Sequence, residues 1–197
     1  MSSVAAALGE AAANSPGAIA IQLREKDLDA RQLYELARAL RPICTRFGAP
    51  LIVNDRIDVA IAAGADGAHL SSASFAITDA RTLLGPNRFI GISTHSAEEV
   101  AMAAAHGADF AVFGPIYNPI SKGAYGPVQG LTALAHAVKA AKGMPLYALG
   151  GINRSRASEI AALPQATRPA GVAAIGAVFG TSRPGNAAHE LIEALNH

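Results

Sequence analysis

"NDRIDVAIAAGADGAHL", residues 54–70, places an alanine-rich stretch with helical character between two apolar runs. The apolar run before it, 50–55, closes on Asn54 and Asp55, and the run after it follows Gly-Ala-Asp-Gly. A similar unit recurs at 103–113, "AAAHGADFAVF", with an alanine-rich helix end, Gly-Ala-Asp and a strand start. Glycine ends a helix readily because it adopts positive φ, and aspartate bonds to turn backbone. The pattern therefore predicts repeated strand, helix and parallel strand units.

The same alternation extends along the chain. Short apolar runs predict strands at 18–24, 50–55, 67–72, 89–94, 110–116, 145–152 and 171–179. Helical patterns lie between and after them, at 31–47, 56–63, 77–84, 97–106, 131–141, 155–163 and 186–196. Uniformly apolar strands are typical of a parallel sheet covered on both faces. We predict the α/β class and a (β/α)8 TIM-type barrel, with residues 1–197 as a single domain.

The count of predicted strands is seven, one short of a complete barrel. The chain opens with what looks like the helix that should follow a first strand. We therefore expect the first strand to be missing or atypical.

Composition narrows the class of partner. Hydrophobic residues make up 51% of the chain, charged residues 16%, and the formal net charge is +1. The Lys and Arg residues are spread out, so we expect no nucleic acid and no membrane as partner, and a small molecule instead. Cys44 is the single cysteine and is predicted to be a buried apolar helix residue, which fits a cytoplasmic protein. The oligomeric state is left open, a homo-oligomer included.

The active site of a TIM barrel lies at the carboxyl ends of its strands. Polar side chains follow the predicted strands at this edge: Gln22, Arg24, Lys26, Asn54, Asp55, Ser71, Ser74, Ser93, His95, Ser121 and Lys122. Asp66 and Asp109 fall at the opposite, amino-terminal edge, where we expect a structural role. His69 lies mid-strand and is predicted to be a packed core residue, whereas His95 fits a general acid or base or a hydrogen-bonded structural residue.

Two anion sites are predicted at the same edge. "LGGIN" at 149–153 and "AIGAVFG" at 174–180 fit a phosphate cradle built on Gly150, Gly151, Ile175 and Gly176. The alternative is that these glycines serve only turns and packing. Arg24, Lys26 and Lys122 suit a diphosphate. Asp55 fits a Mg²⁺ ligand or a helix cap. Motifs for covalent catalysis, zinc or dinucleotide binding are not found in the sequence.

Five segments carry a resemblance to a known family: "QLREKDL" at 22–28, residues 54–70, "LLGPNRFIGISTHSAEE" at 83–99, "GADFAVFGPIYNPISK" at 107–122 and "ALGGIN" at 148–153. Together they resemble thiamine-phosphate synthases and the related thiazole tautomerases. The synthases join hydroxymethylpyrimidine diphosphate to a thiazole phosphate through a pyrimidine-stabilised carbocation and release diphosphate. Such chemistry needs no protein nucleophile, only positive charge on the leaving group and positioned substrates.

The resemblance implies a role for each site residue. The residues implied to hold the pyrimidine diphosphate are Gln22, Arg24, Lys26, Asn54 and Lys122, with Ser121 beside them in the same loop. It places Ser93 next to the pyrimidine and Asp55 on Mg²⁺. The residues implied to lie near the phosphate groups are Gly150, Gly151, Ile175 and Gly176. Lys122, Arg24 and Ser93 are the residues expected to contribute most to catalysis.

The sequence departs from the synthase pattern at two loops. Ser74 stands where the resemblance implies a second aspartate ligand to Mg²⁺, and Pro119 replaces a threonine. The "SSASF" stretch at 71–75 is closer to the tautomerases, which transfer a proton and need no metal. A synthase is our first expectation. A tautomerase using His95 is the second, and a catalytically silent phosphate-ligand binder or another phosphosugar isomerase stays open.

Overall fold

The computed structural model describes residues 2–15, 17–118 and 126–196. Its strands are β1 (Ile21–Leu23), β2 (Leu51–Asn54), β3 (Gly67–Leu70), β4 (Phe89–Thr94), β5 (Phe110–Phe113), β6 (Leu146–Leu149) and β7 (Gly171–Ala173). Its helices are α1 (Ser2–Asn14), α2 (Ala30–Arg46), α3 (Ile57–Ala62), α4 (Ile77–Leu84), α5 (Ala97–Ala105), α6 (Gly130–Ala140), α7 (Arg154–Ala161), α8 (Gly176–Phe179) and α9 (Pro184–Asn196), with a 3₁₀ turn η1 (Gln165–Thr167).

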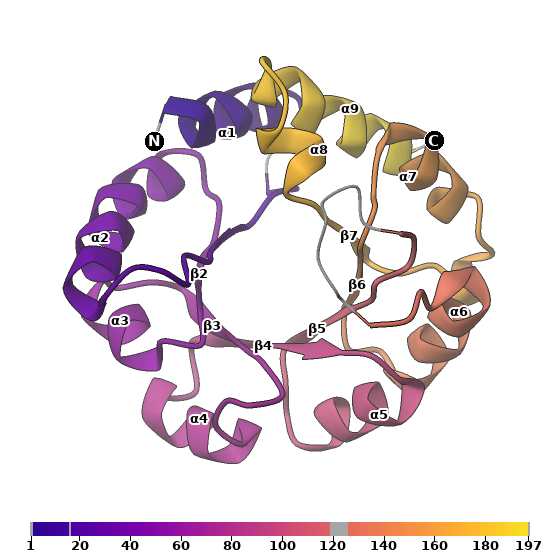
Figure 1. The fold of residues 1–197 in the computed structure, drawn as a ribbon, viewed down its shortest axis with the longest axis horizontal. Coiled ribbons are helices and arrows are strands. Elements are labelled where there is room, and N and C mark those ends of the chain that lie inside the picture. Colours follow the sequence, from indigo (N-terminus) through magenta and orange to yellow (C-terminus); the bar gives the residue numbers. More distant parts are fainter. Residues whose placement is uncertain (1, 16, 119–125, 197) are drawn as a thin grey trace.

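The strands form one parallel sheet in the order β1 to β7, each paired with its neighbours in sequence. The sheet curls into a ring, and the helices surround it (Figure 1). This confirms the predicted TIM-type α/β fold. Among the described strands, β1 and β7 each pair on one edge only. The predicted opening helix is present as α1, which packs against α9 and continues the helical ring between the two sheet edges (Figure 1).

The predicted strand at 171–179 is wrong in its second half. β7 ends at Ala173, and the following residues form the short helix α8. The amide of Gly180 donates to the carbonyl of Gly176 at 3.1 Å, which closes this helical turn. A short apolar run fits a buried strand and a buried helix equally well, so periodicity alone does not separate them. The prediction at 110–116 is too long as well: β5 ends at Phe113, and Pro115 has no N–H to donate to the sheet.

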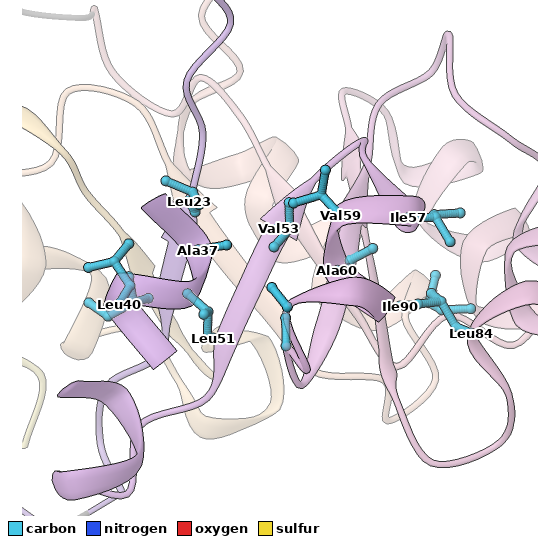
Figure 2. Close-up of a cluster of buried hydrophobic side chains, with 14 of the residues drawn as sticks. Leu23, Ala37, Leu40, Leu51, Val53, Ile57, Val59, Ala60, Leu84 and Ile90 are labelled. Carbon is cyan, nitrogen blue, oxygen red and sulfur yellow. The ribbon is translucent and has the colours of Figure 1, made fainter. Parts of the chain in front are cut away.

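Alternate residues of each strand face opposite sides of the curled sheet. Leu23, Leu51 and Val53 join Ala37 and Leu40 of α2 in a core between the sheet and the helices (Figure 2). A second core of this kind lies under α5, α6 and α7. Because strand side chains alternate with period two, Gln22, Asn54 and His69 point to the inside of the ring.

Two arginine–aspartate pairs fasten the amino-terminal edge of the sheet. The carboxylate of Asp66 accepts from the guanidinium of Arg41 on α2 and from the amide of Leu51. Asp109 repeats the arrangement, accepting from Arg81 of α4 at 2.5 Å and from the amide of Ile90 at 2.6 Å. The predicted structural role of both aspartates is confirmed, although the sequence did not indicate their arginine partners.

Cys44 is fully buried in α2, as predicted, and burial raises the pKa of its thiol. A thiol held in its neutral form is a poor nucleophile. Cys44 therefore belongs to the core rather than to a reactive site.

Candidate active site

A line of hydrogen bonds crosses the carboxyl ends of the first three strands. The side-chain amide of Gln22 donates to Oδ1 of Asn54 at 2.9 Å, and Nδ2 of Asn54 donates to Oδ2 of Asp55 at 2.8 Å. Oδ1 of Asp55 accepts from the amide of Ser71 at 2.9 Å. Three residues that the sequence placed at one edge are thus in direct contact. The side-chain amides of Gln22 and Asn54 both donate toward Asp55. Among the described residues no donor reaches Oε1 of Gln22, so this oxygen is the acceptor at the end of the line.

The backbone at Asp55 turns sharply to present the carboxylate. Its φ is 56°, in the left-handed region that aspartate tolerates better than most residues, and its amide donates to the carbonyl of His69 at 2.8 Å. The alternative of a helix cap is wrong, because α3 begins after Arg56 and has no side-chain cap. The position of Asp55 is therefore set by the sheet edge and not by the start of the helix.

The carboxylate of Asp55 retains acceptor capacity for a cation. Each of its oxygens accepts one hydrogen bond from the protein, and a carboxylate offers about four lone-pair sites. Within the described ranges, no cluster of three or more His, Cys, Asp or Glu side chains is placed to hold a metal. Mg²⁺ is commonly bound through one or two carboxylates together with substrate phosphates and water, so a single aspartate fits this ion. Ser74, where the resemblance implies a second aspartate, is half-buried in the loop after β3 and has a neutral hydroxyl in place of a carboxylate.

Two cations follow β1 and extend into solvent. Arg24 and Lys26 are exposed, and neither has an ion pair or side-chain hydrogen bond among the interactions of the described residues. The positive charge of Arg24 is a minor cause of the lowered pKa of His69, after burial of the imidazole. Both side chains are therefore available to an anionic ligand.

Ser121 and Lys122 lie outside the described residues, so their predicted roles stay predictions. The described flanks of their loop meet at the same sheet edge. The amide of Ile116 donates to the carbonyl of Leu149 at 2.7 Å, and the amide of Gln129 donates to the carbonyl of Pro115 at 2.8 Å. The outgoing flank is thus bonded to the end of β6, and the returning flank is bonded to the segment that follows β5.

Tyr117 anchors the beginning of this loop to α7. Its hydroxyl donates to Glu159 at 2.6 Å, and the guanidinium of Arg156 lies 4.6 Å from the centre of its ring. Burial and the neighbouring Glu159 carboxylate raise the pKa of Tyr117. Tyr117 therefore stays a neutral hydrogen-bond donor at physiological pH.

The turn after β6 requires its two glycines. Gly150 has a φ of 103°, and a Cβ there would lie 2.5 Å from that of Pro115. Gly151 has a φ of 63°, and a Cβ there would lie 2.5 Å from the carbonyl oxygen of Asn118. Ile175 is 64% exposed at the start of α8, and Gly176 faces open space. The four predicted phosphate residues lie after β6 and β7 at the carboxyl edge, and the first two also hold the loop base.

His69 and Ser93 form a contact that the sequence did not predict. His69 is 3% exposed, so its predicted burial is confirmed, and its Nε2 lies 2.9 Å from Oγ of Ser93 on the next strand. Burial in apolar surroundings lowers the pKa of His69 to about 4; the Asp55 carboxylate opposes this shift, and Arg24 adds to it. Period-two alternation in the predicted strands 67–72 and 89–94 would have placed His69 and Ser93 on the same face of the sheet. It does not give the register between the two strands, which decides whether they touch.

His95 sits at the end of β4 with one ring nitrogen engaged. Its Nδ1 lies 2.6 Å from the carbonyl oxygen of Gly114. Because a carbonyl oxygen only accepts hydrogen bonds, Nδ1 carries a hydrogen and donates it. Its amide donates to Glu99 of α5 at 2.6 Å. The structural role is therefore supported, and Nε2 of this exposed ring is left as an acceptor.

The model of the thiamine monophosphate synthase family matches residues 2–178 of this chain. The chain belongs to that family. It is 46% identical over 179 residues to a putative thiamine-phosphate synthase of Geobacter sulfurreducens, covering 91% of this chain and 82% of the relative. It is 41% identical to the thiamine-phosphate synthase of Moorella thermoacetica, covering 91% and 83%.

A solved family structure agrees with the fold. The thiamine phosphate pyrophosphorylase of Pyrococcus furiosus superposes with a TM-score of 0.84 at 35% identity, covering 99% of this chain and 88% of that one. A 3-hexulose-6-phosphate synthase at 20% identity and a TM-score of 0.63 shares the fold alone. The family resemblance predicted from the sequence is thereby confirmed.

Within this thiamine monophosphate synthase family member, the hydrogen-bonded line from Gln22 to Asp55 forms one wall of the candidate site. Ser93 lies on β4 and contacts His69 of the adjacent strand β3, and Arg24 follows β1. Over the described residues, no helix is long and apolar enough to cross a membrane.

Proposed function

We propose that this protein is a thiamine-phosphate synthase, which couples hydroxymethylpyrimidine diphosphate to a thiazole phosphate and releases diphosphate. The observation that carries the proposal is the line Gln22, Asn54 and Asp55, which places amide groups and one carboxylate together at the carboxyl edge of the sheet. The identity of 41–46% to the two synthase relatives over most of the chain supports it. The thiamine phosphate pyrophosphorylase of similar structure supports it further.

The first task of the site is to bind a highly charged leaving group. Arg24 provides a planar fork for phosphate oxygens, and Lys26 adds a mobile point charge. Neither cation is neutralised by a carboxylate among the described residues, so both keep their charge for the ligand. Asp55 would hold Mg²⁺ against the same diphosphate. When bound, Mg²⁺ would neutralise negative charge as it develops on the departing oxygen.

The second task is to hold the pyrimidine while its C–O bond ionises. Ser93 offers one hydroxyl to the ring, and the terminal acceptor of Gln22 offers a site for a donor group. The thiazole phosphate would lie at the other side of the site, with its phosphate near Gly151, Ile175 and Gly176. Positioning the thiazole nitrogen close to the cationic carbon replaces the need for a protein nucleophile.

The deciding experiment is formation of thiamine phosphate by the purified protein from the two substrates, with Mg²⁺ and with a chelator. Product that depends on Mg²⁺ is expected. No product from protein shown to be folded by circular dichroism would overturn the synthase proposal. Product that persists in chelator would overturn only the metal role of Asp55.

One observation favours the tautomerase as a second candidate. The contact of His95 Nδ1 with the carbonyl of Gly114 leaves Nε2 as a proton acceptor at the site edge. Isomerisation of a thiazole carboxylate phosphate, abolished in His95→Gln, would support this reading. Arg24 and Lys26, which form no ion pair with the described carboxylates, favour the synthase because a diphosphate needs positive charge.

A further inference from the structure

The side chain of His69 is buried at the inner face of the sheet with only one ring nitrogen satisfied. Its Nε2 contacts Oγ of Ser93 at 2.9 Å, while Nδ1 is buried and has no hydrogen-bond partner among residues 2–15, 17–118 and 126–196. The ring also packs against Phe110 of β5, with the ring centres 5.7 Å apart. An apolar side chain at this position would have no polar atom to satisfy, whereas histidine leaves one buried nitrogen without a partner among the described residues. The contact with Ser93 is the property that an apolar residue lacks.

The unsatisfied Nδ1 indicates which tautomer is present. A neutral imidazole carries its hydrogen on one nitrogen and a lone pair on the other. Buried N–H groups without an acceptor are rarer in proteins than buried acceptors without a donor. The hydrogen is therefore on Nε2, and this group donates to the oxygen of Ser93.

This assignment fixes what Ser93 can do. Its hydroxyl has a single hydrogen, and the ring nitrogen that faces it is already a donor. Among the described residues, the side chain of Ser93 forms one hydrogen bond, which is the contact with His69. Ser93 is partly exposed near the carboxyl end of β4, so its hydrogen is free for a bound ligand.

We propose that His69 is a positioning residue: as the neutral Nε2–H tautomer, it holds the Ser93 oxygen and leaves the Ser93 hydroxyl to donate to a lone-pair atom of the substrate. The ring nitrogens of an aminopyrimidine are acceptors of this kind. The identity of the substrate rests on the proposed function, whereas the tautomer and the Ser93 contact do not.

The first experiment measures the tautomer directly, without substrate. In ¹⁵N-histidine NMR spectra at neutral pH, the signals of His69 are those lost in His69→Gln. We expect a protonated Nε2 and an unprotonated Nδ1. A protonated Nδ1, with Nε2 unprotonated or with both nitrogens protonated, would overturn the proposal. This outcome is independent of whether the protein makes thiamine phosphate.

The second experiment is a double-mutant cycle on synthase turnover. His69→Asn removes the donor at the Nε2 position, and we expect kcat to fall on the order of 10- to 100-fold with a smaller change in KM. His69→Gln places an amide N–H near the Nε2 position and should recover most of the loss. In a Ser93→Ala background, His69→Asn should cost nothing further.

A matched control separates positioning from stability. Thr94 is 1% exposed on the same strand and donates to the carbonyl of Val112 at 3.1 Å, on the face opposite to Ser93. Thr94→Val should lower the melting temperature without lowering kcat. Equal losses of kcat in Thr94→Val and His69→Asn, or additive losses for His69→Asn and Ser93→Ala, would overturn the proposal. If the wild-type protein makes no thiamine phosphate, the proposed function fails, and the NMR result alone decides the tautomer.

Discussion

Asp55 is the one carboxylate in the hydrogen-bonded line, and its two oxygens already accept from Asn54 and from the amide of Ser71. Asp55→Asn keeps the size of the side chain but removes the anion. We expect synthase turnover at saturating Mg²⁺ to fall on the order of 10²-fold, since a metal that stabilises a leaving group contributes several kcal/mol. The Mg²⁺ concentration for half-maximal rate should rise as well.

Asp58 provides the control for this variant. It lies on α3, its side chain is 66% exposed, and it pairs with Arg56. That pairing lowers the pKa of Asp58. Asp58→Asn should leave both kcat and the Mg²⁺ dependence unchanged. A wild-type Mg²⁺ response in Asp55→Asn would remove Asp55 from the metal site.

Arg24 is the cation for which the proposed function expects the strongest hydrogen bonds to the diphosphate, because its guanidinium is a planar fork. Arg24→Ala should raise KM for the pyrimidine diphosphate by about 10- to 100-fold, since hydrogen bonds to charged groups contribute about 1.5–3 kcal/mol. Arg24→Lys should recover only part of the loss, because lysine lacks the planar fork. Arg38→Ala, which removes an arginine stacked 5.7 Å from the Tyr34 ring on α2, is the matched control. An equal KM for both alanine variants would contradict the assignment.

The sequence predicted the positions of individual site residues well where they lie on strands, because alternate side chains of a strand face opposite sides of the sheet. Gln22, Asn54 and Asp55 were predicted at strand ends, and the structure brings them into contact. The contact between His69 and Ser93 could not be predicted, because it depends on the register of β3 against β4. A histidine in mid-strand looked like a core residue, and it is both buried and hydrogen-bonded toward the site.

At the scale of elements, the paired Arg81 and Asp109 tie α4 to the start of β4 and β5. Asp109→Ala should lower the free energy of unfolding by about 1–3 kcal/mol, because it leaves the amide of Ile90 without its partner. The effect on kcat should be negligible, since the pair lies at the edge of the sheet away from the site. Urea denaturation and steady-state kinetics on the same protein measure both.

Asp79 of α4, for which no ion pair is found among the described residues, is a suitable control site for Asp109→Ala. Asp79→Ala should leave the urea midpoint near that of wild type. If Asp109→Ala is fully folded under the assay conditions and its kcat is still lower, the amino-terminal edge of the sheet is coupled to the active site. It would then no longer be purely structural.

Helices and strands were predictable wherever the length of a segment and its hydrophobic period indicated the same type of element. The Gly-Ala-Asp units end α3 and α5 as expected, with Gly64 and Gly107 both at positive φ. The run at 171–179 failed because its residues are apolar throughout and carry no period. The structure has a helical turn there, closed by the hydrogen bond from the amide of Gly180 to the carbonyl of Gly176.

At the scale of the whole molecule, the parallel topology follows from the alternation of strands and helices, and the sequence predicted it. The junction of α1 with α9 was not predictable, because the partner of each helix depends on where the sheet edges lie. Ala7 and Ala188 meet there in a small buried cluster. Small side chains let the two helices approach closely, and the ring of helices is continuous in spite of the unpaired edges of β1 and β7 (Figure 1).

Acid stability is a property of the whole chain that His69 should influence. Its pKa is lowered to about 4 by burial in the folded protein, against 6.5 as the ordinary value. Between these two pH values the unfolded chain binds a proton that the folded chain does not. Stability therefore rises with pH in this window and is lost as the pH falls from 6.5 to about 4, by at most about 3 kcal/mol from this group.

The measurement is the free energy of unfolding of wild type and His69→Gln from pH 7 to 4, with a chelator present so that Asp55 carries no metal. Every other titratable group is present in both proteins, so the difference between the two isolates the contribution of His69. We expect the advantage of wild type to shrink as the pH falls through this window, because glutamine does not titrate. A difference that stays constant from pH 7 to 4 would mean that His69 is protonated as readily in the folded chain as in the unfolded one. The neutral tautomer proposed for the Ser93 contact would then be untenable below pH 6.5.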